Sequence, residues 1–378
     1  MTATRDDVGR RLSVLHVTQP TEGGVARTVV DLVAAQVDAG WRVGVAAPEG
    51  GPLLAAAGAR GAQIMSWSAG RAPDGRVPGE ALALRRLVAR FRPDVVHLHS
   101  SKSGLAGRLA LRGRVPTIFQ PHAWSFHAQR GVVAGLAVRW ERAAARWTDM
   151  VVCVSEDERR QGAEIGVTAT LRSLPNAVDL ERLRPGDRDA ARRQLGLADA
   201  PTVVTVGRLC RQKGQDLLLQ AWPAVLAQLP QARLVLVGDG PDAAALRAWA
   251  PAGVLFAGQR SDVACWLAAA DVVALPSRWE GMAFALLEAM AAARCVVATD
   301  VEGVREALGP GTTAVVVPED PPALARALVD RLRDPRSAAE EGARARRRAE
   351  RHHDLRAWSA AMLELTRGVA EGSRVAVS

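Results

Sequence analysis

The chain has 378 residues, which is enough for about two domains of ordinary size. With 48% hydrophobic and 24% charged residues, its composition is that of a globular protein and not of a disordered or fibrous one. The net charge is +9, but the basic residues are dispersed and no recognised nucleic-acid-binding motif is present, so nucleic acid is not an expected partner.

The N-terminal segment lacks the apolar stretch of a secretory signal, and no apolar run approaches the roughly 18 residues that a membrane-spanning helix needs. We therefore expect a cytoplasmic protein that is at most peripheral to the inner face of the membrane. The four cysteines are widely spaced without a CxxC pair, which predicts free thiols in a reducing compartment.

Short apolar runs alternate with longer helical stretches, and this pattern occurs twice along the chain. The first series of expected strands comprises residues 12–18, 41–48, 94–100, 116–122 and 150–155, and the second comprises residues 201–207, 232–238, 254–258, 271–277, 294–300 and 314–318. Continuous apolar strands separated by helices are typical of buried parallel sheets, which predicts an α/β protein with two doubly wound domains. In such sheets ligands bind beyond the carboxyl ends of the strands, so functional residues are expected in the loops that follow strands.

A polar segment rich in arginine and proline, residues 179–200, predicts the seam between the domains. We expect an N-terminal domain of residues 1–183, with a C-terminal helix at about residues 355–374 packing back on it. The C-terminal domain is then residues 184–354.

Two glutamates flank a strand-to-helix turn in the second domain. Glu280 follows an expected strand, and Glu288 lies further along the helix after the turn. Glu280 can accept hydrogen bonds from sugar hydroxyls and Glu288 from ribose hydroxyls, while the free amides at the helix N-terminus can bind hydroxyls or a diphosphate. Two ordinary surface glutamates are the alternative. The candidate set is Glu280, Gly281, Met282, Ala283, Phe284 and Glu288.

A second motif, residues 206–214, follows the first strand of the second domain and contains Arg208 and Lys213. Two cations in one strand-end loop can neutralise a diphosphate leaving group without a metal. Lys213 is one of only two lysines in an arginine-rich chain, which favours a specific role over that of a surface cation.

In the first domain, His97 and His99 alternate on an expected strand and so point to one face, as metal ligands do. The sequence shows no obvious third ligand, and no metal site is expected. The next segment opens a helix that contains Lys102 and Ser103, whose N-terminus can hold an anion, with a plain helix cap as an equal alternative. His122 follows the next strand and, on position alone, is a loop histidine.

Residues 280–290 resemble the E-x7-E motif of glycosyltransferase family 4, and residues 206–214 resemble that family's Arg/Lys diphosphate motif. Further segments resemble the family in the same order, and the likeness extends from about Leu12 to Leu365. The resemblance implies the GT-B fold, with two Rossmann-like domains facing a central cleft. It also implies an acceptor-binding N-terminal domain and a nucleotide-sugar-binding C-terminal domain.

The resemblance implies roles for individual residues. Glu280 would bind the donor hexose and Glu288 the ribose, while Arg208 and Lys213 would hold the diphosphate. Two departures from the family pattern, Ala283 and Ala123, put the pocket shape and the turn after His122 in question. The remaining implied site residues are Gly23 and Gly24, where donor and acceptor approach each other, His122 near the donor sugar's hydroxymethyl group, and Lys102, Ser103 and Trp124 on the acceptor side.

The implied reaction is a retaining, metal-independent transfer without a cofactor. A hexose or N-acetylhexosamine would move from a nucleotide diphosphate sugar to a hydroxyl acceptor, in polysaccharide, glycolipid or secondary-metabolite assembly. A UDP-linked donor is the first expectation and GDP-mannose the second. Front-face substitution is favoured because no enzymic nucleophile is obvious. The acceptor is a small molecule or lipid-linked. Residues 124–147 alternate aromatic, apolar and basic side chains, as in a helix that rests on an anionic membrane, although packing on its own domain gives the same pattern.

Other enzyme classes fit less well. The loop from Gly238 to Ala243 formally satisfies the dinucleotide fingerprint, but Pro241 is unusual there and the following strand ends without an acidic residue. A pyridoxal-dependent phosphorylase needs a lysine Schiff base, and both lysines fit other roles. A GT-B nucleotide-sugar epimerase and a non-enzymatic sugar-nucleotide-binding module stay open as alternatives.

Overall fold

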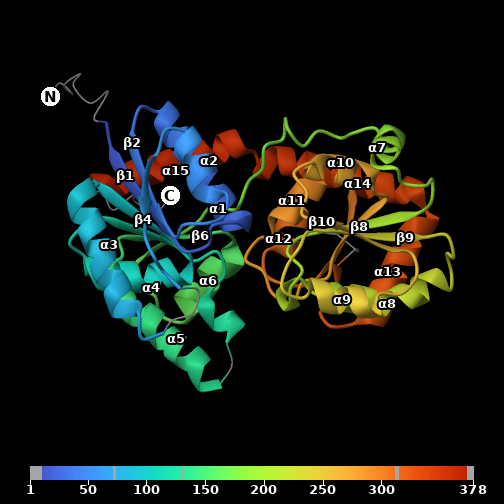
Figure 1. Ribbon diagram of the computed structural model, residues 1–378, viewed down its shortest axis with the longest axis horizontal. Helices are drawn as coiled ribbons and strands as arrows, with labels where there is room; N and C mark the ends of the chain where they lie inside the picture. Colours follow the sequence, from blue (N-terminus) through green and yellow to red (C-terminus); the bar gives the residue numbers. More distant parts are fainter. Residues whose placement is uncertain (1–10, 71–73, 130, 311–314, 373–378) are drawn as a thin grey trace. The chain divides into compact units, whose positions relative to one another are not determined.

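The computed structural model describes residues 11–70, 74–129, 131–310 and 315–372. These residues form two compact units. Unit 1 comprises the described residues up to Leu174 together with those from Ala357 onward, and unit 2 comprises residues from Pro175 to Arg356. Each unit has a parallel sheet with helices on both faces (Figure 1).

Unit 1 contains a seven-stranded sheet with the order β3-β2-β1-β4-β5-β6-β7, in which every neighbouring pair is parallel. The strands are β1 Ser13–Thr18, β2 Arg42–Ala47, β3 Gln63–Ser66, β4 Val95–His99, β5 Thr117–Gln120, β6 Met150–Cys153 and β7 Thr170–Ser173. The helices are α1 Gly23–Asp38, α2 Leu53–Ala59, α3 Val77–Phe91, α4 Ser100–Leu111, α5 Gly131–Ala144, α6 Glu156–Glu164 and α15 Leu355–Ala370, with 3-10 turns at Ser125–Ala128 and Ala145–Trp147.

The two faces of the unit 1 sheet bury separate apolar layers, because successive residues of a strand point to opposite sides. Val14 and Val45 pack with α1 on one face, whereas Leu15 and Leu98 belong to the layer on the other face, which α3 and α4 cover. The C-terminal helix α15 belongs to unit 1, and its Leu363 and Ala370 pack against the apolar layer that α1 covers.

Unit 2 contains a six-stranded sheet with the order β10-β9-β8-β11-β12-β13, which is also parallel throughout. The strands are β8 Thr202–Val206, β9 Arg233–Val237, β10 Val254–Gly258, β11 Val272–Leu275, β12 Cys295–Thr299 and β13 Val315–Val316. The helices are α7 Arg188–Leu195, α8 Gln215–Leu226, α9 Ala243–Trp249, α10 Val263–Ala269, α11 Phe284–Ala291, α12 Val304–Leu308, α13 Pro321–Arg333 and α14 Pro335–His352, with a 3-10 turn at Arg211–Lys213.

The predicted fold class is confirmed, since both units are doubly wound parallel sheets of the Rossmann type. Each expected apolar run contains a strand, although residue 314 of the last run lies outside the described residues. The sequence analysis missed β3 and β7, the two edge strands of unit 1. Neither contains a fully buried residue, so neither has the continuous apolar run by which the other strands were found.

Unit 2 begins at Pro175, earlier than the boundary after residue 183 that the sequence predicts. Hydrogen bonds within unit 2 explain the difference. The amide of Val178 donates to the carbonyl of His353 at 3.0 Å, and the amide of Leu355 donates back to Val178 at 3.2 Å. The guanidinium of Arg346 also donates to the carbonyls of Leu180 and Leu183. These bonds tie the segment after Pro175 to the end of α14.

Among the described residues, none of the helices combines the length and the apolar character needed to cross a membrane.

Candidate functional site

The order of the strands in unit 2 reverses between β8 and β11, the point at which doubly wound sheets bind ligands. Arg208 and Lys213 lie in the loop after β8, and Glu280 lies in the loop after β11. The residues that the sequence predicts for the donor site therefore flank the switch point of the unit 2 sheet.

Backbone contacts join these two loops. The amide of Arg278 donates to the carbonyl of Gln212 at 2.8 Å, and the side-chain amide of Gln212 donates to the carbonyl of Trp279 at 3.1 Å. Gly214 ends the first loop with φ of +66°, and a Cβ at this position would lie 2.0 Å from the carbonyl oxygen of Pro276. Only glycine allows the two loops to approach this closely.

Lys213 and Glu280 meet between these loops in an ion pair, with Nζ 2.6 Å from Oε1. The hydroxyl of Ser277 donates to the same oxygen at 2.8 Å, and Glu280 is only 8% exposed. Among the residues that the structure describes, no protein donor bonds the other oxygen, Oε2. Since an ammonium group has three hydrogens, Lys213 also keeps donors for a ligand. The pair thus offers one acceptor and one cation at the same place.

Arg208 lies in the loop after β8 and, unlike Arg278 in the loop after β11, has no carboxylate partner among the described residues. Arg278 pairs with Asp216 at 2.6 Å and with Glu319 at 2.8 Å, and these carboxylates raise its pKa. The guanidinium of Arg208 is half-buried and makes no ion pair within the described ranges of the chain. An unpaired, partly buried arginine favours the binding of an anion such as a diphosphate.

Helix α11 supplies the rest of the predicted donor site. Phe284 and Glu288 are its partly exposed residues and lie one turn apart, while the other residues of the helix are buried. The side-chain amide of Asn176 donates to the carbonyl of Met282 at 2.9 Å and holds the turn before the helix. Ala283 is the residue at the N-cap of α11, and its carbonyl accepts from the amides of Leu286 and Leu287 at 3.1 and 3.4 Å.

Gly281 belongs to the same turn and contacts the loop before α12. Gly303 has φ of +75°, and a Cβ there would lie 2.2 Å from the carbonyl oxygen of Gly281. The turn that carries the predicted donor residues is therefore packed on three sides, by Asn176, by the 207–214 loop and by Gly303.

In unit 1 the strand order reverses between β1 and β4. Gly23 and Gly24 are exposed at the start of α1, directly after the loop that follows β1, and Gly23 has φ of +75°. These glycines lie at the switch point of the unit 1 sheet, where the sequence analysis expects them to meet a ligand.

His122 follows β5 in a strained turn. His122 has φ of +56° and Ala123 has φ of +100°, a region that residues other than glycine rarely adopt. Glu158, which is buried, holds the turn by accepting from the amide of Ala123 at 2.7 Å. The position of Glu158 is set by the N-cap of α6, where the hydroxyl of Ser155 accepts from the Glu158 amide at 3.0 Å. Strained backbone held in this way is typical of functional sites.

Replacement of Ala123 by glycine is expected to stabilise the protein by roughly 1 kcal/mol, because relief of the positive φ outweighs the larger conformational entropy of glycine in the unfolded chain. Ala163, an exposed residue of α6, is the matched control, and its replacement by glycine should destabilise by about 1 kcal/mol. Urea unfolding of the two variants measures both values. Equal destabilisation by both substitutions would contradict the strained turn.

The structure brings three histidines together beside His122. His16 of β1, His97 and His99 are fully buried, and their ring nitrogens lie within 4.8 Å of one another. Burial lowers the pKa of His16 to about 4 and holds the pKa values of His97 and His99 well below the ordinary range. Sequence reasoning found the two histidines of β4 but missed His16. The register of the sheet, which pairs His16 with His97, brings it to the same face.

The three residues predicted on the acceptor side lie in the interior of unit 1. Lys102 is 6% exposed, and its Nζ forms an ion pair with Glu80 at 2.7 Å. The hydroxyl of Ser103 donates to the carbonyl of His99 within the first turn of α4. Trp124 is 2% exposed and donates to the carbonyl of Glu158. Burial and internal bonds occupy these polar groups in the structure, and their contact with an acceptor stays a prediction.

The glycine-rich loop after β9 is shaped by protein contacts. A Cβ at Gly238 would lie 2.0 Å from the carbonyl oxygen of Gly207, and one at Gly240 would lie 2.3 Å from that of Leu209. The amide of Leu209 also donates to Asp239 at 2.9 Å. These glycines therefore let the loop pack against the predicted diphosphate loop, which accounts for the apparent dinucleotide fingerprint.

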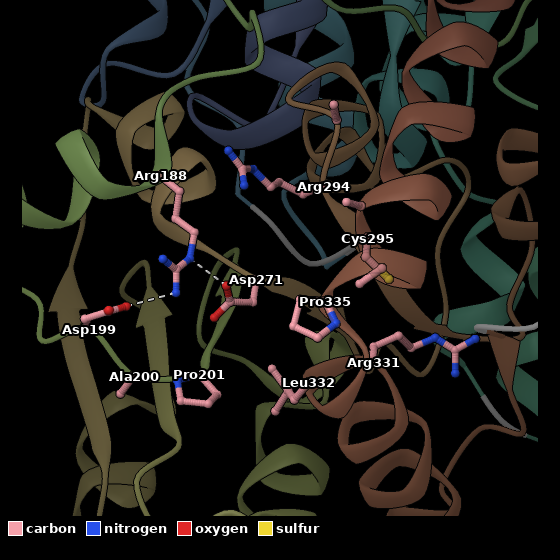
Figure 2. A pocket seen from close by; sticks show the side chains of 13 residues that line it. Arg188, Asp199, Ala200, Pro201, Asp271, Arg294, Cys295, Arg331, Leu332 and Pro335 are labelled. Carbon is pink, nitrogen blue, oxygen red and sulfur yellow. Dashed lines mark hydrogen bonds and ion pairs between the residues drawn. The ribbon is translucent and has the colours of Figure 1, made fainter.

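Figure 2 shows a pocket of about 540 Å³ in unit 2 that lies at the opposite edge of the sheet. Asp271 and Cys295, which line it, stand at the amino ends of β11 and β12. Arg188 points toward Asp271 and Asp199, with contacts of 2.7 and 3.1 Å. Two of the three arginines that line the pocket, Arg188 and Arg331, form ion pairs, whereas Arg294 donates to the carbonyls of Ala270 and Gly186. Because ligands of these sheets bind at the carboxyl ends of the strands, we interpret this pocket as structural.

The fold and the two switch points define a two-domain protein of the GT-B type. Two family models match the chain: Glycosyltransferase Family 4 over residues 22–182, and Glycosyl transferases group 1 over residues 200–334. The chain belongs to glycosyltransferase family 4.

Two curated relatives have a phosphatidylinositol or a diphosphoundecaprenol acceptor in their names, while others are named D-inositol 3-phosphate glycosyltransferases. The chain is 36% identical over 208 residues to the GDP-mannose-dependent monoacylated alpha-(1-6)-phosphatidylinositol monomannoside mannosyltransferase of Corynebacterium glutamicum, covering 51% of this chain and 55% of the relative. It is 32% identical over 238 residues to the UDP-Gal:alpha-D-GlcNAc-diphosphoundecaprenol alpha-1,3-galactosyltransferase of Escherichia coli. This match covers 59% of this chain and 62% of the relative. The chain thus spans less than two thirds of the length of either relative.

Among solved structures, the chain is similar to sucrose-phosphate synthase from Thermosynechococcus elongatus. The TM-score is 0.82 at 25% identity, and the match covers 96% of this chain and 100% of that one. The likeness includes both units.

Proposed function

We propose that the protein is a retaining glycosyltransferase that moves a hexose or an N-acetylhexosamine from a nucleotide diphosphate sugar to a hydroxyl acceptor. The observation that carries the proposal is the Lys213–Glu280 pair at the switch point of unit 2, in which Glu280 Oε2 has no protein donor among the described residues. Arg208, which makes no ion pair within the same part of the chain, is the second support.

In the proposed mechanism, Glu280 Oε2 accepts hydrogen bonds from hydroxyls of the donor sugar. Arg208 and Lys213 stabilise the negative charge that develops on the departing diphosphate, so that no metal is required. The bond from the anomeric carbon to the diphosphate oxygen breaks as the bond to the acceptor oxygen forms on the same face. The departing phosphate oxygen takes the acceptor's proton. Because the new bond forms on the face that the diphosphate leaves, the anomeric configuration is retained. Trapping of a covalent glycosyl-enzyme on an aspartate or glutamate would contradict this mechanism.

We propose a UDP-linked sugar as donor, with GDP-mannose second. The relatives named above are described as UDP-Gal-dependent and GDP-mannose-dependent, so they support both nucleotides. Glu288, one turn along α11 from Phe284, is the proposed partner of the ribose hydroxyls, which both nucleotides share. His122 is proposed to contact the hydroxymethyl group of the donor sugar.

For the acceptor we propose a lipid-linked molecule that the protein meets at the surface of a membrane. Helix α5 exposes apolar side chains at its start, with Val132 80% and Leu136 58% exposed. Exposed arginines, Arg139 and Arg142, follow on the same helix. An apolar tip followed by cations suits insertion into an anionic membrane surface. Both relatives named above are described as acting on lipid-linked molecules.

The double substitution Val132→Ser and Leu136→Ser is expected to weaken binding to vesicles with anionic phosphatidylglycerol by roughly tenfold or more, because two exposed apolar groups no longer leave water on binding. Sedimentation at low salt measures the effect. Leu82→Ser is the matched control, since Leu82 is 49% exposed on α3, and it should bind as the wild type does. Absence of wild-type sedimentation would contradict membrane contact.

The test of the proposed function is incubation of the full chain with a panel of UDP- and GDP-sugars, with and without acceptors, followed by NMR of the products. We expect consumption of one donor to require a hydroxyl acceptor or water, with retention at the anomeric carbon. Conversion of the donor to another nucleotide sugar without an acceptor would identify an epimerase. Binding without any turnover would identify a sugar-nucleotide-binding module.

A further inference from the structure

A chain of hydrogen bonds runs through the interior of unit 1 and ends at His122. Oε1 of Gln36, on α1, lies 2.8 Å from Nε2 of His16. Nδ1 of His16 lies 3.0 Å from Nε2 of His99, and Nδ1 of His99 lies 3.2 Å from Nε2 of His122. Gln36, His16 and His99 have no exposed surface. The bonds between the rings satisfy nitrogens that are costly to bury unpaired, so the chain is a specific arrangement and not a solvated cluster. Nε2 of Gln36 has no partner among the described residues.

Both ring nitrogens of His16 and of His99 are used within this chain. A neutral imidazole carries one N–H donor and one acceptor nitrogen, so the direction of each hydrogen bond determines the direction of the next. Burial lowers the pKa values of His16, His99 and His122, which keeps all three rings neutral at pH 7. The tautomers of the three rings are therefore coupled, since the tautomer of each ring determines that of the next.

The direction follows from Gln36. Its carbonyl oxygen faces His16, so Nε2 of His16 carries the hydrogen and Nδ1 accepts from His99. Nδ1 of His99 then accepts from Nε2–H of His122. We propose that Gln36, His16 and His99 are positioning residues that fix the tautomer of His122, leaving its Nδ1 as a hydrogen-bond acceptor.

The inference rests on the proposed function in one respect, namely that His122 contacts the donor sugar. An acceptor nitrogen at Nδ1 selects a hydroxyl group as its partner and disfavours a carbonyl or carboxylate oxygen at the same place. The strained backbone of His122 and Ala123, held by Glu158, fixes the ring at the end of the chain. The relay is thus a device for recognising a donor-sugar hydroxyl.

His97 provides the matched control. Its ring stacks on His99 with the centroids 3.9 Å apart, and it is equally buried. None of the three bonds of the relay uses a ring nitrogen of His97, whose polar neighbour is the side chain of Gln120. Loss of His97 removes a buried histidine next to the relay without removing a bond of the relay.

The experiment is nitrogen-15 NMR of the full chain with labelled histidines, which reports the tautomer of each ring without any substrate. In the wild type we expect His16, His99 and His122 each to be a neutral Nε2–H tautomer. In Gln36→Met, which has similar size but no amide, His122 should become a mixture of tautomers. In His97→Leu, the tautomer of His122 should be unchanged.

Turnover of the donor provides the second measurement. Gln36→Met should lower kcat/KM by about tenfold or more, as for other groups that orient a functional histidine. His97→Leu should lower it less.

Two results would overturn the relay. One is an Nδ1–H or mixed His122 in the wild type, which decides the question even where a variant fails to fold. The other is a zinc titration that shifts His16, His97 and His99 together, which would assign their lone pairs to a metal. If the tautomers are as expected but no nucleotide sugar is turned over, the proposed function fails and the relay stands.

Discussion

Replacement of Glu280 by glutamine is expected to lower kcat/KM for the proposed transfer by about 10²–10³-fold. The carboxylate is the acceptor for sugar hydroxyls, and each charge-assisted hydrogen bond contributes roughly 1.5–3 kcal/mol. Glutamine keeps the size of the side chain but loses the charge, and its ion pair with Lys213, 2.6 Å in the wild type, is lost. Because the side chain of Lys213 is 23% exposed, water can solvate the cation, and we expect the variant to fold.

The matched control is Glu350→Gln on α14. Glu350 also forms an ion pair at 2.7 Å, with Arg346, but its side chain is 48% exposed. Exposed pairs of this kind contribute about 0–1 kcal/mol, so activity should be unchanged. Steady-state kinetics at varied donor concentration separates kcat from KM. Equal activities of Glu280→Gln and the wild type would show that the sugar does not bind at Glu280.

The second large effect is a loss of stability in mild acid. Five histidines, His16, His97, His99, His122 and His353, have lowered pKa values, about 4 for His16 and His353 and about 3 for His122, and burial is the main cause in each. In the unfolded chain the same side chains have a pKa near 6.5. Below that pH the unfolded state binds protons that the native state does not bind, so stability falls as the pH falls from about 6.5 to about 4.

The magnitude follows from linkage. Each neutral histidine costs about 1.4 kcal/mol at one pH unit below its unfolded pKa, so the five together remove about 6 kcal/mol between pH 7 and pH 5.5. That loss is comparable to the whole stability of many proteins. Urea unfolding at pH 7.5, 6.5 and 5.5 measures it, and most of the loss should occur between the last two values.

A pair of neighbouring histidines separates this effect from general acid denaturation. His353 is 2% exposed and its ring bonds the carbonyl of Asn176 at 2.8 Å, whereas His352 is exposed. His353→Gln should reduce the pH dependence by about a fifth, and His352→Gln should leave it unchanged. A wild-type stability that is flat from pH 7.5 to 5.5 would contradict neutral buried histidines.

The sequence predicts a strand well where the strand itself is a continuous apolar run. Central strands such as β1 and β8 are continuous apolar runs, and the loops after them were found from the same pattern. The edge strands β3 and β7 were missed because each is paired on one side only and needs no apolar run. The domain boundary was displaced because hydrogen bonds to His353, near the other end of unit 2, hold Val178.

The sequence predicts the two loops of the site, but it does not predict that Lys213 and Glu280 contact each other. Lys213 and Glu280 are 67 positions apart in sequence, and only the parallel pairing of β8 with β11 brings them to one place. The same limit hid His16, which reaches the histidines of β4 through the register of β1. The sequence also does not show which polar side chains are buried. Lys102 has the charge of a ligand-binding residue, but Glu80, on α3, holds it in the interior.

The central claim is that the loops after β8 and β11 form a nucleotide-sugar site. Isothermal titration calorimetry of UDP- and GDP-sugars into the wild type and into Arg208→Met tests it most directly. We expect one nucleotide sugar to bind the wild type, and the loss of the unpaired guanidinium to weaken that binding by at least about tenfold, since a charge-assisted contact with a diphosphate contributes roughly 1.5–3 kcal/mol. A nucleotide sugar that binds both proteins equally, or a panel in which none binds the wild type, would contradict the account.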